Sequence, residues 1–218
     1  MRGGADAGPD VDDLKRTVAD KWDHKEAIDE MAYSPDGTRL VTGSHDNFMN
    51  LYDAQSPDYA LVARCVGHSS YITHIDWSAD SRCFQSTCGA YELLYWHGRS
   101  GKQIISDQRN QAWDTYTSTL GFSVMEIWQD GSDGTDINAL DRSHRQVRFA
   151  GEDPLAGEHP VVVTSGDDGA VRLFNYPCVV EDAPNHKYIG HSSHVMMARF
   201  APHNRWVITT GGKDRAIF

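Results

Sequence analysis

A repeat of about 44 residues constrains the fold of this chain more than any other feature of its sequence. The tetrapeptide GHSS occurs at residues 67–70 and again at 190–193, and each copy opens a stretch with the same order of residue types. Upstream, the stretch that begins at His24 matches the one that begins at His68, with no gap in the alignment. A chain that repeats at this period folds as an array of similar units, because each unit buries apolar surface against the next.

The residues inside each copy are those of short β-strands. Apolar and β-branched runs such as TRLVTGS, VVVTS and WVITT are separated by the turn sequences SPDG, GDDG and GGKD. This spacing, with GH near the start and an aromatic residue near the end, is typical of the four-stranded blade of a β-propeller. The sequence therefore predicts an all-β fold: a partial WD40-type β-propeller with three four-stranded antiparallel blades and most of a fourth.

The repeats also predict where one unit ends and the next begins. The predicted units are an N-terminal segment at 1–22, a blade at 23–66, a blade at 67–106, a blade with a long insertion at 107–189, and an incomplete blade at 190–218. The apolar spacing within residues 1–22 suits either a short amphipathic helix or the outer strand of a preceding blade, and we expect the strand. Propellers close with about 4–8 blades. We therefore expect the remaining blades of a longer chain to pack against this one.

The repeated polar residues are expected to bond to one another inside each blade. A histidine before the first strand can bond a hydroxyl on the second strand, an aspartate in the next turn can orient that histidine, and an aromatic ring on the third strand packs beside it. A buried polar group without such partners is costly. The predicted network comprises His24, Thr42, Asp46 and Tyr52; His68, Ser86 and Trp96; Thr164, Asp168 and Phe174; and His191, Thr210 and Asp214.

Two blades depart from this pattern. Ala90 stands where the second blade needs its aspartate, so we expect a weaker network there. The third blade lacks the usual histidine, and His144, the alternative, lies late in its segment.

The insertion between residues 104 and 160 is the predicted partner-binding segment. STLGFSVMEIW is expected to form a strand or hairpin, and TDINALDRSH the first strand of the third blade. Long loops on a rigid scaffold often carry binding. The candidate partner-binding residues are Trp128, Asp130, Asp133, Asp136 and Arg142. The alternatives are that Trp128 packs the insertion against the third blade and that the acidic turn is merely solvated.

Composition and motifs narrow the class of function. The net charge of −11 argues against a nucleic-acid or anionic-membrane partner, and no apolar run approaches the ~20 residues that span a bilayer. The chain has no GxSxG, phosphate-binding loop or HExxH, and its acidic turn fails the EF-hand spacing. The four cysteines form no CxxC pair. We predict no catalytic residues, no metal site and no cofactor, and thus no enzyme.

Several of these runs together resemble the echinoderm microtubule-associated protein-like family, from about Asp23 to Phe218. LGFSVMEIW, GSDGTDINALDRS and the NYPC at residues 175–178 carry this resemblance more specifically than the GH and aromatic positions, which are generic to WD repeats. In that family the resemblance implies two joined propellers that associate with microtubules, and this chain resembles the closing blades of the second.

The resemblance implies a function and a cellular place. We expect a non-catalytic protein–protein interaction scaffold that binds tubulin, microtubules or microtubule-associated proteins in the cytoplasm and cytoskeleton, with the cilium or axoneme as a possible site. The acidic balance argues against simple attraction to tubulin's acidic tails. The alternative is a generic WD-repeat adaptor in an unrelated multiprotein complex.

Overall fold

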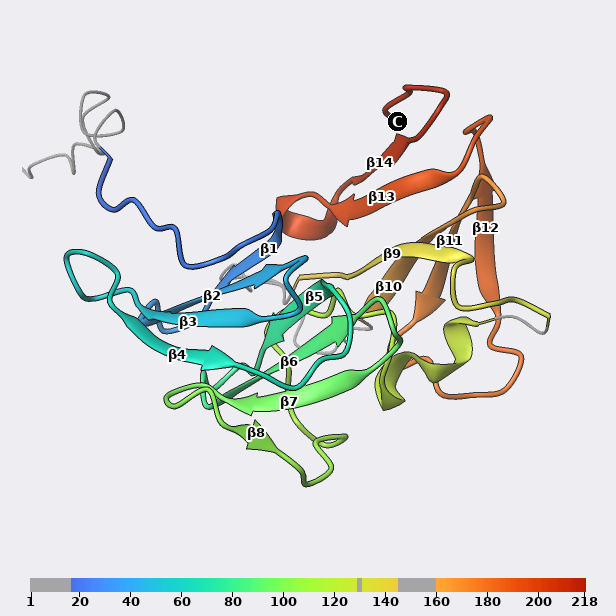
Figure 1. Ribbon diagram of the computed structural model, residues 1–218. Coiled ribbons are helices and arrows are strands. Elements are labelled where there is room, and N and C mark those ends of the chain that lie inside the picture. The colour runs from blue at the N-terminus through green and yellow to red at the C-terminus, as the bar shows by residue number, and fades with distance from the viewer. Residues whose placement is uncertain (1–16, 129–130, 145–159) are drawn as a thin grey trace, which may run out of the picture.

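A computed structural model describes residues 17–128, 131–144 and 160–218 of the chain (Figure 1). The first sheet contains β1 (Ile28–Tyr33), β2 (Arg39–Ser44), β3 (Met49–Asp53) and β4 (Leu61–Cys65). The second contains β5 (Ile72–Trp77), β6 (Cys83–Cys88), β7 (Leu93–His97) and β8 (Gln103–Ile104). The third contains β9 (Ile137–Arg142), β10 (Val161–Gly166), β11 (Ala170–Asn175) and β12 (Asn185–Ile189). The fourth contains β13 (Val195–Phe200) and β14 (Val207–Gly211).

Each strand pairs antiparallel with the next strand of its own sheet, so every sheet is a simple meander. The sheets follow one another through space in chain order (Figure 1). This arrangement confirms the predicted all-β fold, a partial WD40-type β-propeller. The sheets are called blades one to four below, and the blade boundaries within the connecting segments stay predictions.

The middle strands are buried on both faces. Every residue of β6 is buried, and β2 and β10 are buried from their second residue onward. The outer strand β12, by contrast, is mostly exposed. A strand packed between neighbours on both faces carries apolar or bonded residues at every position, rather than alternating polar and apolar ones. The interfaces between blades are therefore the core.

Each interface has its own apolar cluster. Trp77 and Phe84, whose ring centroids are 5.0 Å apart, lie in the cluster between blades one and two with Leu51. Trp77 also donates its indole N–H to the carbonyl of Ala32 across this interface, at 3.1 Å. Between blades three and four, Phe200 packs with other apolar residues of both sheets. Buried aromatic rings of this kind contribute about 1.5–3 kcal/mol each.

The turn between the first two strands is built the same way in blades one and two. In residues 34–37 and 78–81 the serine hydroxyl donates to the aspartate two positions on, at 2.6 and 2.7 Å. The fourth residue of each turn has positive φ, 69° at Gly37 and 59° at Ser81. The second copy thus retains the turn without the glycine that best tolerates it.

The insertion is part of the core, and its local structure corrects one sequence-based expectation. The run predicted to be a strand or hairpin instead contains the 3₁₀ helix η2 (Phe122–Ile127). Trp113, Tyr116 and Val124 are buried in one cluster with residues of blades two and three. This segment therefore packs between those blades and buries part of its apolar side chains there.

A buried carboxylate holds the insertion against blade two. Asp76 on β5 is fully buried. Its Oδ1 accepts from the hydroxyl of Thr115 at 2.8 Å, and from the backbone N–H and hydroxyl of Thr117 at 2.8 and 3.0 Å. Its Oδ2 accepts from the backbone N–H of Ser118 and the amide of Gln85, both at 3.1 Å. A buried carboxylate needs such donors to offset the cost of its burial.

Residues 17–24 form neither helix nor strand, so the strand expected within residues 1–22 does not include the described residues of that segment. Val11 and Leu14, on which the helical alternative partly depended, lie outside the described residues. β9 falls within the segment predicted to open the third blade. In the described part of the chain, no helix is long and apolar enough to cross a membrane.

Replacing Asp76 with Asn should lower the free energy of unfolding by about 2–4 kcal/mol, because an amide N–H₂ would then face backbone and hydroxyl donors. Urea unfolding followed by tryptophan fluorescence measures this loss. Asp114→Asn, an exposed aspartate on the same segment, is the control and should change stability by less than about 0.5 kcal/mol. Equal stability of both variants would show that the carboxylate is not the anchor.

Candidate functional site

The histidine network of blade one has the predicted partners. His24 Nε2 lies 2.8 Å from the hydroxyl of Thr42, and its Nδ1 lies 3.1 Å from Asp46 Oδ2. The side chains of His24 and Asp46 are 3% and 5% exposed. The backbone N–H of Lys25 donates to the same Asp46 oxygen at 3.0 Å. Tyr52 is buried and lines the same cleft as His24 and Thr42.

Blade four repeats this network with a different threonine. His191 Nε2 lies 2.9 Å from Thr209 Oγ1 and its Nδ1 lies 2.8 Å from Asp214 Oδ2. The prediction of Thr210 was wrong, since neighbouring residues on a strand point to opposite faces of the sheet. The histidine and its hydroxyl are 18 positions apart in blades one and four. That constant interval would have identified Thr209.

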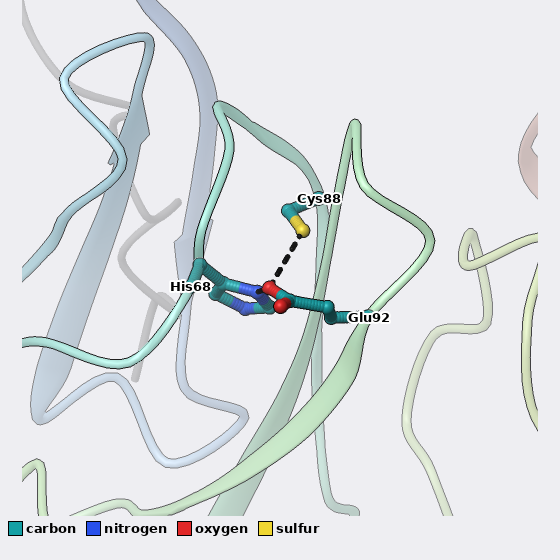
Figure 2. Close-up of side chains that lie close together, drawn as sticks. All are labelled: His68, Cys88 and Glu92. Carbon is teal, nitrogen blue, oxygen red and sulfur yellow. Dashed lines mark hydrogen bonds and ion pairs between the residues drawn. The ribbon is translucent and has the colours of Figure 1, made fainter.

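Blade two has an acidic partner that the sequence analysis missed. His68 Nε2 lies 2.7 Å from Ser86 Oγ, which also accepts the indole N–H of Trp96 at 2.8 Å. His68 Nδ1 lies 3.3 Å from Oε2 of Glu92, two positions beyond Ala90 (Figure 2). The longer side chain of a glutamate reaches back to the place that an aspartate takes in the other blades. The network expected to be incomplete at Ala90 therefore has its carboxylate.

Further bonds support this assignment of Glu92. The backbone N–H of Ser69 donates to Glu92 Oε2 at 2.9 Å and its hydroxyl donates to Oε1 at 2.8 Å. Lys25 and Ser192 donate their backbone N–H in the same way to the aspartates of blades one and four. The bonds from Ser69 lower the pKa of Glu92 to about 2, and burial lowers the pKa of His68.

Acidification should weaken blade two. The pKa of Glu92 is depressed from 4.5, so its contribution to stability is present above pH 4.5 and is lost as the pH falls toward 2. The pKa of His68 is also below its ordinary 6.5, so its contribution is complete above that pH and declines on acidification. Urea unfolding at pH 7, 5 and 3.5 should show a smaller loss of stability in Glu92→Gln than in the wild type. Parallel losses in the two proteins would contradict this account.

In blade three the aspartate of the network pairs with basic side chains instead of a histidine. Thr164 and Phe174 are buried as predicted, but Asp168 pairs with Arg172 Nη2 at 2.5 Å and Lys187 Nζ at 3.1 Å. His144 does not take the histidine's place, because its Nε2 bonds the carbonyl of Phe200 at 3.1 Å. A cavity of about 260 Å³ lined by Thr164, Asp168 and Arg172 lies beside this pair.

Alanine substitutions at Asp46 and at Asp168 should lower the free energy of unfolding by different amounts. Asp46→Ala leaves His24 without its acceptor and is expected to cost about 1–3 kcal/mol of unfolding free energy. Asp168→Ala removes ion pairs of a side chain that is 42% exposed, and is expected to cost about 1 kcal/mol or less. Thermal and urea unfolding of both variants measure the difference. An equal or larger loss in Asp168→Ala would refute the distinction.

The predicted partner-binding residues separate into two groups: Arg142 and Trp128, which pack inward, and the aspartates of the acidic turn. Arg142 is buried, donates to the carbonyls of Trp113 at 3.0 Å and Asp114 at 2.7 Å, and lies over the ring of Tyr176, with its guanidinium carbon 5.2 Å from the ring centroid. Its assignment to a partner surface was therefore wrong. Trp128 is half-buried and donates its indole N–H inward to the carbonyl of Thr119, at 3.1 Å.

The second group is the acidic turn that contains Asp133 and Asp136, and it lies at the surface. Asp133 is exposed and accepts from the backbone N–H and hydroxyl of Thr135 at 2.8 and 2.6 Å. Asp136 is half-buried, and its Oδ2 accepts from the backbone N–H of Asp133 at 2.7 Å. These local bonds hold both carboxylates in a defined turn. Asp130 lies outside the described residues.

The serine, histidine and glutamate of blade two have the connectivity of a hydrolytic triad, but not its accessibility. Ser86 is 1% exposed, and its Oγ already accepts the indole N–H of Trp96. A nucleophile must reach a substrate carbonyl, and this hydroxyl is enclosed. A similar arrangement recurs in blades one and four, which indicates a structural role inside each blade.

Known proteins resemble this chain over most of its length. The family described as "Echinoderm microtubule-associated protein second beta-propeller" matches residues 9–218. Echinoderm microtubule-associated protein-like 4 of Homo sapiens is 46% identical over 200 residues, which are 89% of this chain and 19% of that protein. Echinoderm microtubule-associated protein-like 2 of Rattus norvegicus is 44% identical over 209 residues, which are 94% of this chain and 30% of that protein. Among solved structures, the computationally designed Ika4 protein aligns with 93% of this chain and 96% of its own, at 16% identity and a TM-score of 0.44.

Proposed function

The chain belongs to the echinoderm microtubule-associated protein family, and on that basis we propose that it is a non-catalytic scaffold that binds microtubules or microtubule-associated proteins. The observation that carries this proposal is the match of the second-propeller family to residues 9–218. The chain spans about a fifth of the length of the human relative. Any activity that belongs to the whole of such a relative is therefore only proposed for this chain. The proposed location is the cytoplasm and cytoskeleton, including cilia or axonemes.

The geometry supports a scaffold because the repeated polar side chains are used inside the blades. His24, His68 and His191 each bond a buried hydroxyl and a carboxylate of their own blade. What remains for recognition are loops and turns at the rims, which the packed sheets hold in place. Binding spread over several such loops needs no reactive group.

The exposed acidic turn is the surface that we propose meets a partner. Asp133 and Asp136 present carboxylates from a turn fixed by its own hydrogen bonds, so little conformational entropy is lost on binding. With a net charge of −11, the chain favours a neutral or basic surface, and the tubulin body or another microtubule protein suits it better than an acidic tail.

A second proposed partner is further propeller structure. Blade one has an open cleft of about 710 Å³ lined by Trp22, Ile28, Leu40 and other residues. Ile28, Met31 and Tyr33 on β1 are each at least half exposed. Apolar side chains grouped in this way are usually covered by another surface. We propose that another blade covers them.

Co-sedimentation with assembled microtubules tests the proposed function. The chain should pellet with microtubules and remain in the supernatant with actin filaments. A generic adaptor would stay in the supernatant in both cases, and that result would overturn the proposal.

A charge reversal locates the contact. Asp133→Lys should lower the pelleted fraction several-fold, as expected for an exposed charge worth up to about 1 kcal/mol. Asp58→Lys is the matched control, because Asp58 is also an exposed aspartate bonded to a neighbouring hydroxyl, that of Ser56. Equal binding of both variants would place the contact away from the acidic turn.

A further inference from the structure

Blade two brings together a set of metal-ligand atoms that the sequence does not place side by side. His68 precedes β5, Cys88 ends β6 and Glu92 precedes β7, and their side chains converge (Figure 2). Glu92 Oε2 lies 3.3 Å from His68 Nδ1 and 3.1 Å from Cys88 Sγ. Among the described residues, this is the one group of three His, Cys, Asp or Glu side chains whose ligand atoms lie within 4.8 Å of one another.

The spacing of these atoms suits a small tetrahedral ion. Zinc bonds of about 2.0–2.3 Å to nitrogen, oxygen and sulfur place neighbouring ligand atoms roughly 3.3–3.7 Å apart. The separations of His68 Nδ1 and Cys88 Sγ from Glu92 Oε2, 3.3 and 3.1 Å, lie within a few tenths of an ångström of these values, and all three ligand atoms lie within 4.8 Å of one another. Imidazole, thiolate and carboxylate together favour zinc over magnesium or calcium, which prefer oxygen ligands.

The histidine is oriented for this role. Its Nε2 faces Ser86 Oγ at 2.7 Å, so a proton on Nε2 can be donated to that oxygen. The indole of Trp96 donates to the same oxygen, which has two lone pairs and can accept both bonds. Without metal, the ring can instead carry its proton on Nδ1 and donate it to Glu92. The tautomer protonated at Nε2, which zinc selects, presents the Nδ1 lone pair toward Glu92 and Cys88. Histidines that bind metal usually donate their other ring N–H in this way.

The other blades with a histidine do not offer the third ligand. The position 20 residues after the histidine is Cys88 in blade two, Ser44 in blade one and Gly211 in blade four. A Cβ at Gly211 would lie 1.9 Å from Asp214 Oδ1 and 2.5 Å from His191 Nδ1, so the aspartate and histidine there leave no room for a side chain. Blade one has room for Ser44 at this position, but a serine hydroxyl is a poorer zinc ligand than a thiolate.

We propose that His68 Nδ1, Cys88 Sγ and a Glu92 carboxylate oxygen bind one Zn²⁺, with solvent as the fourth ligand. The side chain of Glu92 is 35% exposed, which leaves the ion a path from solvent. In this structure the proton of the Cys88 thiol forms a hydrogen bond to Glu92. Zinc replaces that proton, which is released to solvent while a Zn–S bond forms. The ion would tie the GHSS loop to the turn between β6 and β7.

Titration of the full chain with Co²⁺, which reports thiolate ligation by a strong near-ultraviolet absorption band, and then with Zn²⁺ tests this site. One equivalent of Co²⁺ should produce the band, and Zn²⁺ should abolish it by displacement. Cys88→Ser should lose the band and weaken binding by about 100-fold or more. Serine occupies this position in blade one, so the variant is expected to fold. Cys178→Ser, at a buried cysteine outside the group, is the control and should keep the band.

A measurement on the wild-type chain covers the case in which Cys88→Ser fails to fold. Zinc should slow alkylation of Cys88, mapped by mass spectrometry, and leave the rate at Cys178 unchanged. Absence of the cobalt band in the wild type, its persistence in folded Cys88→Ser, or equal effects of zinc at both cysteines would overturn the proposal.

Discussion

The structure depends on the packing of successive sheets face to face. A single blade buries little on its own, and its middle strands are apolar or bonded at every position because both of their faces must be covered. The three apolar clusters lie one at each interface, and no cluster among the described residues belongs to one blade alone. The folding stability of each blade thus depends on the blades packed against it. A blade face without a neighbour leaves apolar side chains exposed to solvent.

Polar groups inside this packing must find partners within their own blade, and the blades do so differently. Blades one and four use histidine, threonine and aspartate, with the backbone N–H after the histidine as an additional donor. Blade two exchanges the aspartate for Glu92, and blade three replaces the histidine with the Asp168–Arg172 pair. The constant requirement is a satisfied carboxylate, rather than a particular set of residues. The exchange in blade two also brings a thiol beside the imidazole.

The insertion shows why length alone is a poor guide to a binding loop. Its aromatic residues pack between blades two and three, and Asp76 on β5 holds it with four hydrogen bonds. Arg142, which looks like a surface cation in the sequence, is buried and bonds two backbone carbonyls of this segment. The part of the insertion that we propose for a partner is the exposed acidic turn around Asp133.

The sequence by itself determined the fold class, the strands of the repeated units, and the histidine networks of blades one and four apart from one threonine. These features repeat at fixed intervals along the chain, so comparing the repeats reveals them without coordinates. Only the tertiary structure decided which residues meet across different strands. Glu92 reaches His68 from two positions beyond the expected place because its side chain is longer, and Thr209 faces His191 because adjacent strand residues alternate between faces. The burial of Arg142 depends on how two blades and the insertion converge, and no local pattern in the chain records that convergence.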